Sequence, residues 1–148
     1  MAVVPFGAYI AAHGHKLESW YGPERLQRMF AHRWLLDAQI PTGGSSDYSA
    51  SPYEPLYAIQ SMVTRTAENG ACLGSHQRIT PYEALHVYTV GSARAAGEEH
   101  IKGSLVPGQL ADYVVLQEDP LTVTPEDISS IPVLHTALGT QVTWSART

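Results

Sequence analysis

The sequence predicts an α/β fold in two parts, a βα-repeat unit over residues 1–101 and strands of a small β domain over residues 102–148. Two observations carry this prediction. Segments with helical periodicity alternate with short apolar pieces over the first two-thirds of the chain, whereas strand and turn residues fill the remainder after Gly97. The 148-residue length and 44% hydrophobic content suit a globular chain with a true core.

The first elements are a strand, a polar loop and a helix. "AVVPFGAYI" is an apolar strand, and "AAHGHKL" after it is expected to be a loop because it holds two histidines around a glycine. A helix is predicted over residues 23–38, with Pro23 at its first turn, where a proline is tolerated. Its apolar stripe consists of Leu26, Met29, Phe30 and Trp34.

The middle of the chain predicts a short strand and two more helices. "IPTGG" is the strand, and it opens into the loop "TGGSSDYSASP". Helices are expected over residues 55–68 and 81–96. The second has the clearest start in the chain, because Thr80-Pro81-Tyr82-Glu83 combines an N-cap hydroxyl, a proline at the first position and a reciprocal glutamate.

The final third predicts strands. "LADYVVLQEDP" contains a run of β-branched and aromatic residues after a Pro-Gly turn. "PVLHTALGTQVTW" is expected to be a hairpin that bends near Gly139-Thr140. β-strands should therefore dominate after Lys102.

Composition excludes several classes of function. The net charge of −5 and the lack of a Lys/Arg cluster argue against nucleic acid as a partner. No apolar run approaches the roughly 18 residues of a membrane span, so no membrane partner is expected. The apolar opening lacks a basic start and contains Pro5 and Gly7, which disfavours a signal peptide and favours a cytoplasmic protein. A single cysteine, Cys72, rules out an internal disulfide, and we expect it to be a small apolar filler.

Asp47 is the one acid in the loop that follows "IPTGG". In a βα repeat, site residues project from the carboxyl ends of strands, and the small residues around Asp47 would let a ligand or metal approach. An aspartate that only caps the next turn fits the same spacing, and for a lone carboxylate it is the better interpretation. From spacing alone both remain open.

His13 and His15 raise the question of a metal pair. Alternate residues of a strand point the same way, but a glycine separates the two histidines, and no third ligand lies nearby in the sequence. Polar loop residues are therefore the more economical interpretation of "HGH".

Three stretches together resemble a known family. They are "RMFAHRWLLDAQIPTGGSSDYSASPYEPLYAIQSMVTR", "QRITPYEALHVYTVGSARAA" and "EEHIKGSLVPGQLADYVVLQEDPLTVTPEDISSIPVLHTALGTQVTW". They are similar to the C-terminal third of metal-dependent amidohydrolases, in the D-aminoacylase-like branch called amidohydrolase family 3. The phrase "KGSLVPGQLADYVVL" is widespread in that superfamily, and the combination with "SSD" and "TRT" is more specific. The likeness runs from about Val3 to Trp144.

The resemblance implies a fold and a chemistry. Residues 1–101 would be the last βα units of a (β/α) TIM barrel, and residues 102–148 the C-terminal strands of a small composite β-sandwich. Asp47 matches the acid that ends the eighth barrel strand, a catalytic metal-site residue that takes a proton from a metal-bound water. His13 would contact substrate. The complete enzyme would use a divalent metal, zinc by expectation, to hydrolyse non-peptide C–N bonds of small amide-type substrates.

Departures from the family pattern qualify this expectation. Ser45 and Gln39 stand where the family usually has glycine. The family's other metal ligands and its N-terminal sandwich strands have no match here, so we expect an incomplete fragment, inactive by itself and not a tight zinc binder. It would need a missing N-terminal portion or a partner chain. Open strand edges would also permit a homo-oligomer. The alternative is a non-catalytic remnant or subunit that only packs against or binds a partner chain.

Overall fold

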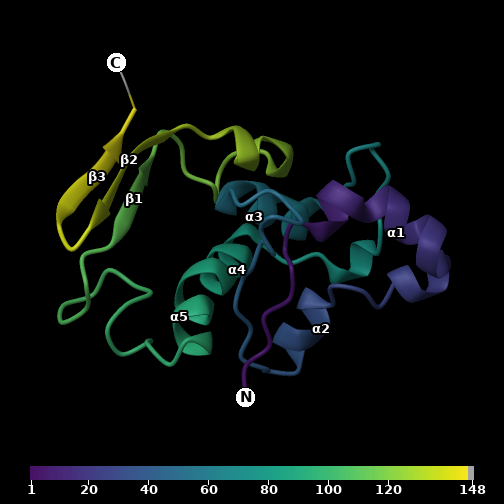
Figure 1. The fold of residues 1–148 in the computed structure, drawn as a ribbon, viewed down its shortest axis with the longest axis horizontal. Helices are drawn as coiled ribbons and strands as arrows, with labels where there is room; N and C mark the ends of the chain where they lie inside the picture. Colours follow the sequence, from purple (N-terminus) through teal and green to yellow (C-terminus); the bar gives the residue numbers. More distant parts are fainter. Residues whose placement is uncertain (147–148) are drawn as a thin grey trace.

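The computed structural model describes residues 1–146 of the chain (Figure 1). Helices fill the first two-thirds, and all three named strands follow residue 112. The elements in order are α1 (Tyr9–Leu26), α2 (His32–Asp37), α3 (Pro55–Thr64), η1 (Ser75–Gln77), α4 (Pro81–His86), the π-helical η2 (Val87–Gly91), α5 (Ser92–Ala95), β1 (Tyr113–Leu116), η3 (Pro125–Ser130), β2 (Val133–Leu138) and β3 (Gln141–Ser145).

Two short parallel segments bring the beginning of the chain beside the loop of Asp47. Val3 pairs with Thr42, and Phe6 pairs with Ser45. The Gly43 N–H donates to the Val3 carbonyl at 3.0 Å. Both segments were predicted as strands, and each is present only as these isolated bridges. α1 and α2 form the connection between the two segments, and parallel neighbours need a long crossover of this kind.

The prediction of a loop at "AAHGHKL" is wrong, because His13 and His15 lie within α1. The glycine between them serves close packing rather than a turn. A Cβ on Gly14 would lie 2.6 Å from a methyl carbon of Leu73. Only glycine lets the helix approach that side chain so closely.

The predicted helix over residues 23–38 is present in two pieces. Gly22, at φ 77° and ψ 160°, kinks α1 so that Pro23 opens a new helical turn, but this turn ends at Leu26. Phe30 then adopts a positive φ of 50°, and helix resumes only at His32. Left-handed backbone cannot continue a right-handed helix, so the apolar stripe overestimates the length of this helix.

The other two predicted helices form with small differences. α3 starts at Pro55 as expected but stops at Thr64, because Arg65 is left-handed at φ 56°. The helix over residues 81–96 is continuous through α4, η2 and α5, and Gly97 follows it with φ 74°. Its capping box is formed as predicted.

The π turn η2 fits this helix tightly against the 42–45 segment. The Val87 carbonyl accepts a hydrogen bond from the Gly44 N–H at 3.0 Å, and the Ser92 hydroxyl donates to the same carbonyl at 3.0 Å. A Cβ on Gly91 would collide with the Thr42 carbonyl. The 42–45 segment, which leads to Asp47, is therefore held in place by hydrogen bonds and backbone contacts from the 81–96 helix.

The C-terminal strands form an antiparallel sheet in the order β1-β2-β3, which lies at the opposite end of the molecule from α1 (Figure 1). The hairpin between β2 and β3 bends at Gly139 and Thr140, as predicted, and both residues have positive φ. η3 links this part to the helices, because Ile128 is fully buried beside α3 and the Gln60 side chain accepts from the Ser129 N–H at 2.8 Å.

Two buried apolar clusters hold the helical part together. The larger joins α3 to the following helix and to η3, and the smaller joins α1 to the chain after α3. Their members are Ile59, Met62, Val63, Ile79, Ala84, Val87 and Ile128 in the first, and Ile10, Leu17, Leu26, Ala67 and Leu73 in the second. Among residues 1–146 no helix is long and apolar enough to cross a membrane.

The capping box gives a first stability prediction. The Thr80 hydroxyl accepts from the Glu83 N–H at 3.2 Å, and the Glu83 carboxylate accepts from the Thr80 N–H at 2.8 Å. Thr80→Ala removes one of these bonds and should lower the free energy of unfolding by about 1 kcal/mol. Urea unfolding measures the loss, and Thr80→Ser, which keeps the hydroxyl, is the control. If the parent protein, Thr80→Ala and Thr80→Ser all have the same free energy of unfolding, the helix starts elsewhere.

Candidate functional site

Asp47 lies at the carboxyl end of the 42–45 segment, in a sharp turn. Its backbone is left-handed at φ 56°. The Asp47 N–H donates to the Ser45 hydroxyl at 3.2 Å, and the Asp47 carbonyl accepts from the Ala50 N–H at 2.8 Å. The residue is only partly buried. Its main chain therefore shapes the turn while its side chain is left to interact elsewhere.

The side chain of Asp47 is hydrogen-bonded to Tyr9, at the start of α1. The Tyr9 hydroxyl donates to Oδ2 of Asp47 at 2.5 Å. This bond, together with desolvation and the carboxylate charge, raises the pKa of Tyr9. The phenol therefore stays a hydrogen-bond donor throughout the neutral pH range.

His13 lies one helical turn after Tyr9 and also reaches the Asp47 loop. Its Nε2–H donates to the Ala50 carbonyl at 2.7 Å, and its ring meets that of Tyr9 edge-on with centroids 5.0 Å apart. His15 is two residues further along the same helix, about 200° around its axis, so the two rings diverge. The helix brings His13, but not His15, to the loop of Asp47.

Next to Tyr9, the Phe30 carbonyl is the common acceptor of a buried polar cluster. It accepts from the Arg65 Nη1–H at 3.0 Å, from the His32 N–H at 2.9 Å and from the His32 Nδ1–H at 3.0 Å. The Phe30 ring packs on Tyr9 with centroids 5.3 Å apart. This cluster therefore fixes one wall of the space that Tyr9 occupies.

Burial sets the protonation of this cluster. Desolvation lowers the pKa of His32 to about 4 and that of Arg65 to about 10, and the guanidinium also disfavours charge on the imidazole. Since His32 donates through Nδ1, its buried Nε2 is an acceptor, and no partner for it lies among residues 1–146. At neutral pH the cluster holds one charge, on Arg65.

The metal-ligating side chains of residues 1–146 do not form a complete metal centre. Among residues 1–146 no three His, Cys, Asp or Glu side chains are close enough to hold an ion. Asp47 offers one carboxylate, and one of its oxygens already accepts from Tyr9. A catalytic zinc site needs three protein ligands, so the described residues alone do not fit one.

Cys72 is exposed rather than an apolar filler, and its sulfur accepts from the Arg78 guanidinium at 3.1 Å.

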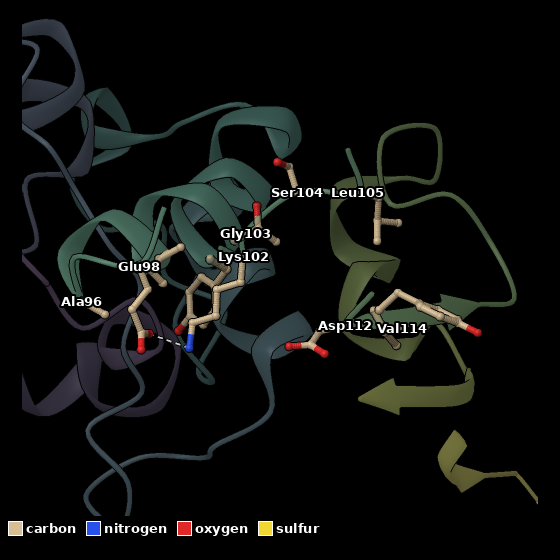
Figure 2. A pocket seen from close by; sticks show the side chains of 13 residues that line it. Ala96, Glu98, Lys102, Gly103, Ser104, Leu105, Asp112 and Val114 are labelled. Carbon is tan, nitrogen blue, oxygen red and sulfur yellow. Dashed lines mark ion pairs between the residues drawn. The ribbon is translucent and has the colours of Figure 1, made fainter. Parts of the chain in front are cut away.

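A separate hollow of about 600 Å³ lies between the 81–96 helix and the C-terminal strands (Figure 2). It contains the Glu98–Lys102 ion pair, with Nζ and Oε2 2.6 Å apart, and the side chain of Asp112. Neither Asp47 nor His13 lines it. The ion pair neutralises the charges of Glu98 and Lys102, and the Asp112 carboxylate accepts from the Gly139 N–H at 2.7 Å, so we keep Asp47 as the candidate reactive group.

Sequence reasoning missed Tyr9. No motif marks Tyr9 in "GAYIAAHG", and the loop expected there directed attention to His13 instead. The available signal was the register: two parallel segments end side by side, at Phe6 and Ser45, so the residues just after them meet.

Asp47 thus lies just beyond the carboxyl end of one of two segments in parallel pairing, which are joined by helices. The chain belongs to the amidohydrolase family, whose family model matches residues 3–143.

Two relatives and one solved structure show the extent of the likeness. YtcJ of Bacillus subtilis, named only as a candidate amidohydrolase, is 31% identical over 83% of this chain and 24% of its own length. N-substituted formamide deformylase of Arthrobacter pascens is 30% identical over 83% of this chain and 23% of its own length. An uncharacterized metal-dependent hydrolase of Pyrococcus horikoshii OT3 superposes with a TM-score of 0.74 at 26% identity, over 84% of this chain and 26% of that one. The chain thus spans about a quarter of the length of each.

The buried imidazole predicts a pH dependence of stability. The folded pKa of His32 is about 4 against an ordinary 6.5, so the folded state binds fewer protons between these values. The contribution of neutral His32 to the free energy of unfolding is therefore complete above pH 6.5. It declines as the pH falls toward 4, by about 2 kcal/mol between pH 7.5 and pH 5. Urea unfolding at the two pH values measures it. His32→Asn keeps a donor for the Phe30 carbonyl but does not titrate. Between pH 7.5 and pH 5 its free energy of unfolding should therefore fall by about 2 kcal/mol less than that of the parent protein. An equal fall in both proteins would mean that His32 is not held neutral.

The incomplete ligand set predicts weak metal binding. Titration calorimetry of the 148-residue chain with zinc should give no stoichiometric site of sub-micromolar affinity, because at most one carboxylate and a loop-facing histidine are at hand. Asp47→Ala should leave the zinc isotherm almost unchanged. A tight one-to-one site that Asp47→Ala abolishes would contradict this account of the ligand set.

Proposed function

We propose that this chain is the C-terminal section of a metal-dependent hydrolase that acts on non-peptide C–N bonds of amide-type substrates. The observation that carries the proposal is Asp47, beyond the end of a segment in parallel pairing, with its carboxylate held from the side by Tyr9. Membership of the amidohydrolase family over residues 3–143 supports the reaction class. A relative named N-substituted formamide deformylase supports the amide-type substrate.

In this proposal Asp47 is the acid of the metal site and the proton acceptor of the reaction. A divalent cation, zinc by preference, would lower the pKa of a water that it binds to about 7. Asp47 would accept a proton from the attacking water and return it to the departing nitrogen. The carboxylate is partly buried, and it is carried by a left-handed turn two residues beyond the 42–45 segment.

His13 is proposed to contact the substrate. It lies beside Tyr9 on α1, and its Nε2 is already bonded to the Ala50 carbonyl. The ring edge and Nδ1 are therefore the parts left to meet a ligand. This bond also lets His13 hold the loop, so its loss should weaken substrate binding more than it slows the chemistry.

The proposed partner is the rest of the hydrolase, as a preceding portion or a separate chain. The chain would then supply the last units of a (β/α) barrel and part of a composite β-sandwich. One face of the C-terminal sheet supports this, because Val114, Leu138 and Trp144 are exposed on it, with Trp144 opposite Thr136 and Val114 on the other side of Thr136. The edges of β1 and β3 also carry unpaired backbone groups, which a second copy of the chain could use instead.

The test is Asp47→Asn in the complete hydrolase, with this chain joined to its N-terminal portion. Asparagine keeps the size and can still accept from Tyr9, but it cannot take a proton. The metal-dependent hydrolysis of an N-acyl or N-formyl amide should fall by about 10²- to 10⁴-fold. Metal content and circular dichroism are measured alongside the rate. Near-normal turnover with full metal would make Asp47 a turn residue and favour a non-catalytic module.

A further inference from the structure

We propose that Tyr9 is the positioning residue of Asp47: its hydroxyl holds Oδ2 and so directs Oδ1, which has no bond of its own among the described residues, toward the reacting groups. This inference rests on the proposed role of Asp47 and adds a residue to it. The bond joins α1 to a loop 38 residues later in the chain, at 2.5 Å.

Backbone register places the two residues together. Phe6 and Ser45 are paired partners in the parallel segments. Tyr9 follows the first by three residues and Asp47 follows the second by two, so both emerge at the same end. The Gly7 N–H also donates to the Ser45 carbonyl at 3.0 Å, which fixes the start of α1 against the turn before Asp47.

Three rings hold the phenol of Tyr9 in place. Phe6 lies 4.9 Å away between centroids, His13 lies 5.0 Å away edge-on, and Phe30 lies 5.3 Å away. Phe30 is itself fixed, since its carbonyl accepts from the buried guanidinium of Arg65. A phenol packed on three sides loses little further entropy when its hydroxyl bonds a carboxylate.

The carboxylate is fixed from its own side as well. The Asp47 N–H donates to the Ser45 hydroxyl and the Ala50 N–H donates to the Asp47 carbonyl, and these bonds close the turn. The His13 Nε2–H donates to the Ala50 carbonyl. Tyr9 and His13 come from one face of α1, four residues apart, and therefore act on the two ends of the same loop. The remaining freedom of the Asp47 side chain is rotation of its carboxylate, which the Tyr9 bond restrains.

This restraint matters for the chemistry. A free carboxylate can rotate and present either oxygen, whereas one whose Oδ2 accepts a hydrogen bond from a fixed phenol presents Oδ1 in one direction. Partners that hydrogen-bond a reactive carboxylate orient it, and their removal typically costs about 10- to 100-fold in metal affinity or activity. Tyr9 therefore acts through Asp47 rather than on the substrate.

The first arm of the test uses the 148-residue chain itself. Tyr9→Phe and Asp47→Ala each remove the bond and should each lower the folding equilibrium constant, Tyr9→Phe by roughly tenfold, and the double variant should be no less stable than the worse single one. The ¹³C resonance of the Asp47 carboxyl should move in Tyr9→Phe. Tyr21→Phe, which changes a half-exposed tyrosine on the same helix, should move neither quantity.

The second arm uses the complete hydrolase. Tyr9→Phe should lower kcat by roughly 10- to 100-fold and leave KM within about twofold. Added to Asp47→Asn, it should lower kcat no further, because the two act as one unit. Tyr21→Phe should retain the rate of the parent protein.

Each contrary result has one meaning. Additive effects of the two substitutions on stability, or an unmoved Asp47 resonance, would show that the bond does not form and would overturn the proposal. Loss of activity in Asp47→Asn with full kcat in Tyr9→Phe would leave Tyr9 a structural residue. Full activity in Asp47→Asn would remove the proposed role of Asp47, and the function of Tyr9 with it, even if the first arm shows coupling.

Discussion

The guanidinium of Arg65, at 1% exposure, joins parts of the chain that the sequence keeps far apart. It donates to the carbonyls of Met29, Phe30 and Leu73, at 3.2, 3.0 and 3.0 Å. A buried charge is tolerated only when its donors are satisfied, and carbonyl groups that turn away from a helix are satisfied in return. The bonds therefore allow α1 to end and α2 to begin where they do. They need Gly74 as well, since a Cβ there would lie 2.8 Å from Nη2.

The candidate site depends on this interaction through a short series of contacts. Arg65 holds the Phe30 carbonyl, the Phe30 ring packs on Tyr9, and Tyr9 bonds Asp47. On the other side, the π turn and its Gly91 hold the 42–45 segment from behind. Loop residues reach a defined geometry only when rigid elements fix both of their ends, and here the helices provide them.

Much of the fold follows from local chemistry in the sequence. The capping box at Thr80, the proline starts of α3 and α4, and the hairpin bend at Gly139-Thr140 depend on neighbours within four residues, so they could be predicted. The split of the 23–38 helix could not. The apolar stripe there is continuous, and the break at Phe30 exists because Arg65, 35 residues later, takes its carbonyl.

The sequence by itself determined the α/β class, the family and the position of Asp47 in a loop after a strand-like segment, because these rest on residue type and spacing. The tertiary structure alone decided that "HGH" lies in a helix, where Gly14 packs on Leu73, and that Tyr9 meets Asp47. Both facts depend on which distant segments lie side by side. Helical periodicity and turn composition report local backbone preference, whereas a glycine in close packing and a tyrosine bonded across 38 residues are set by the pairing of Phe6 with Ser45.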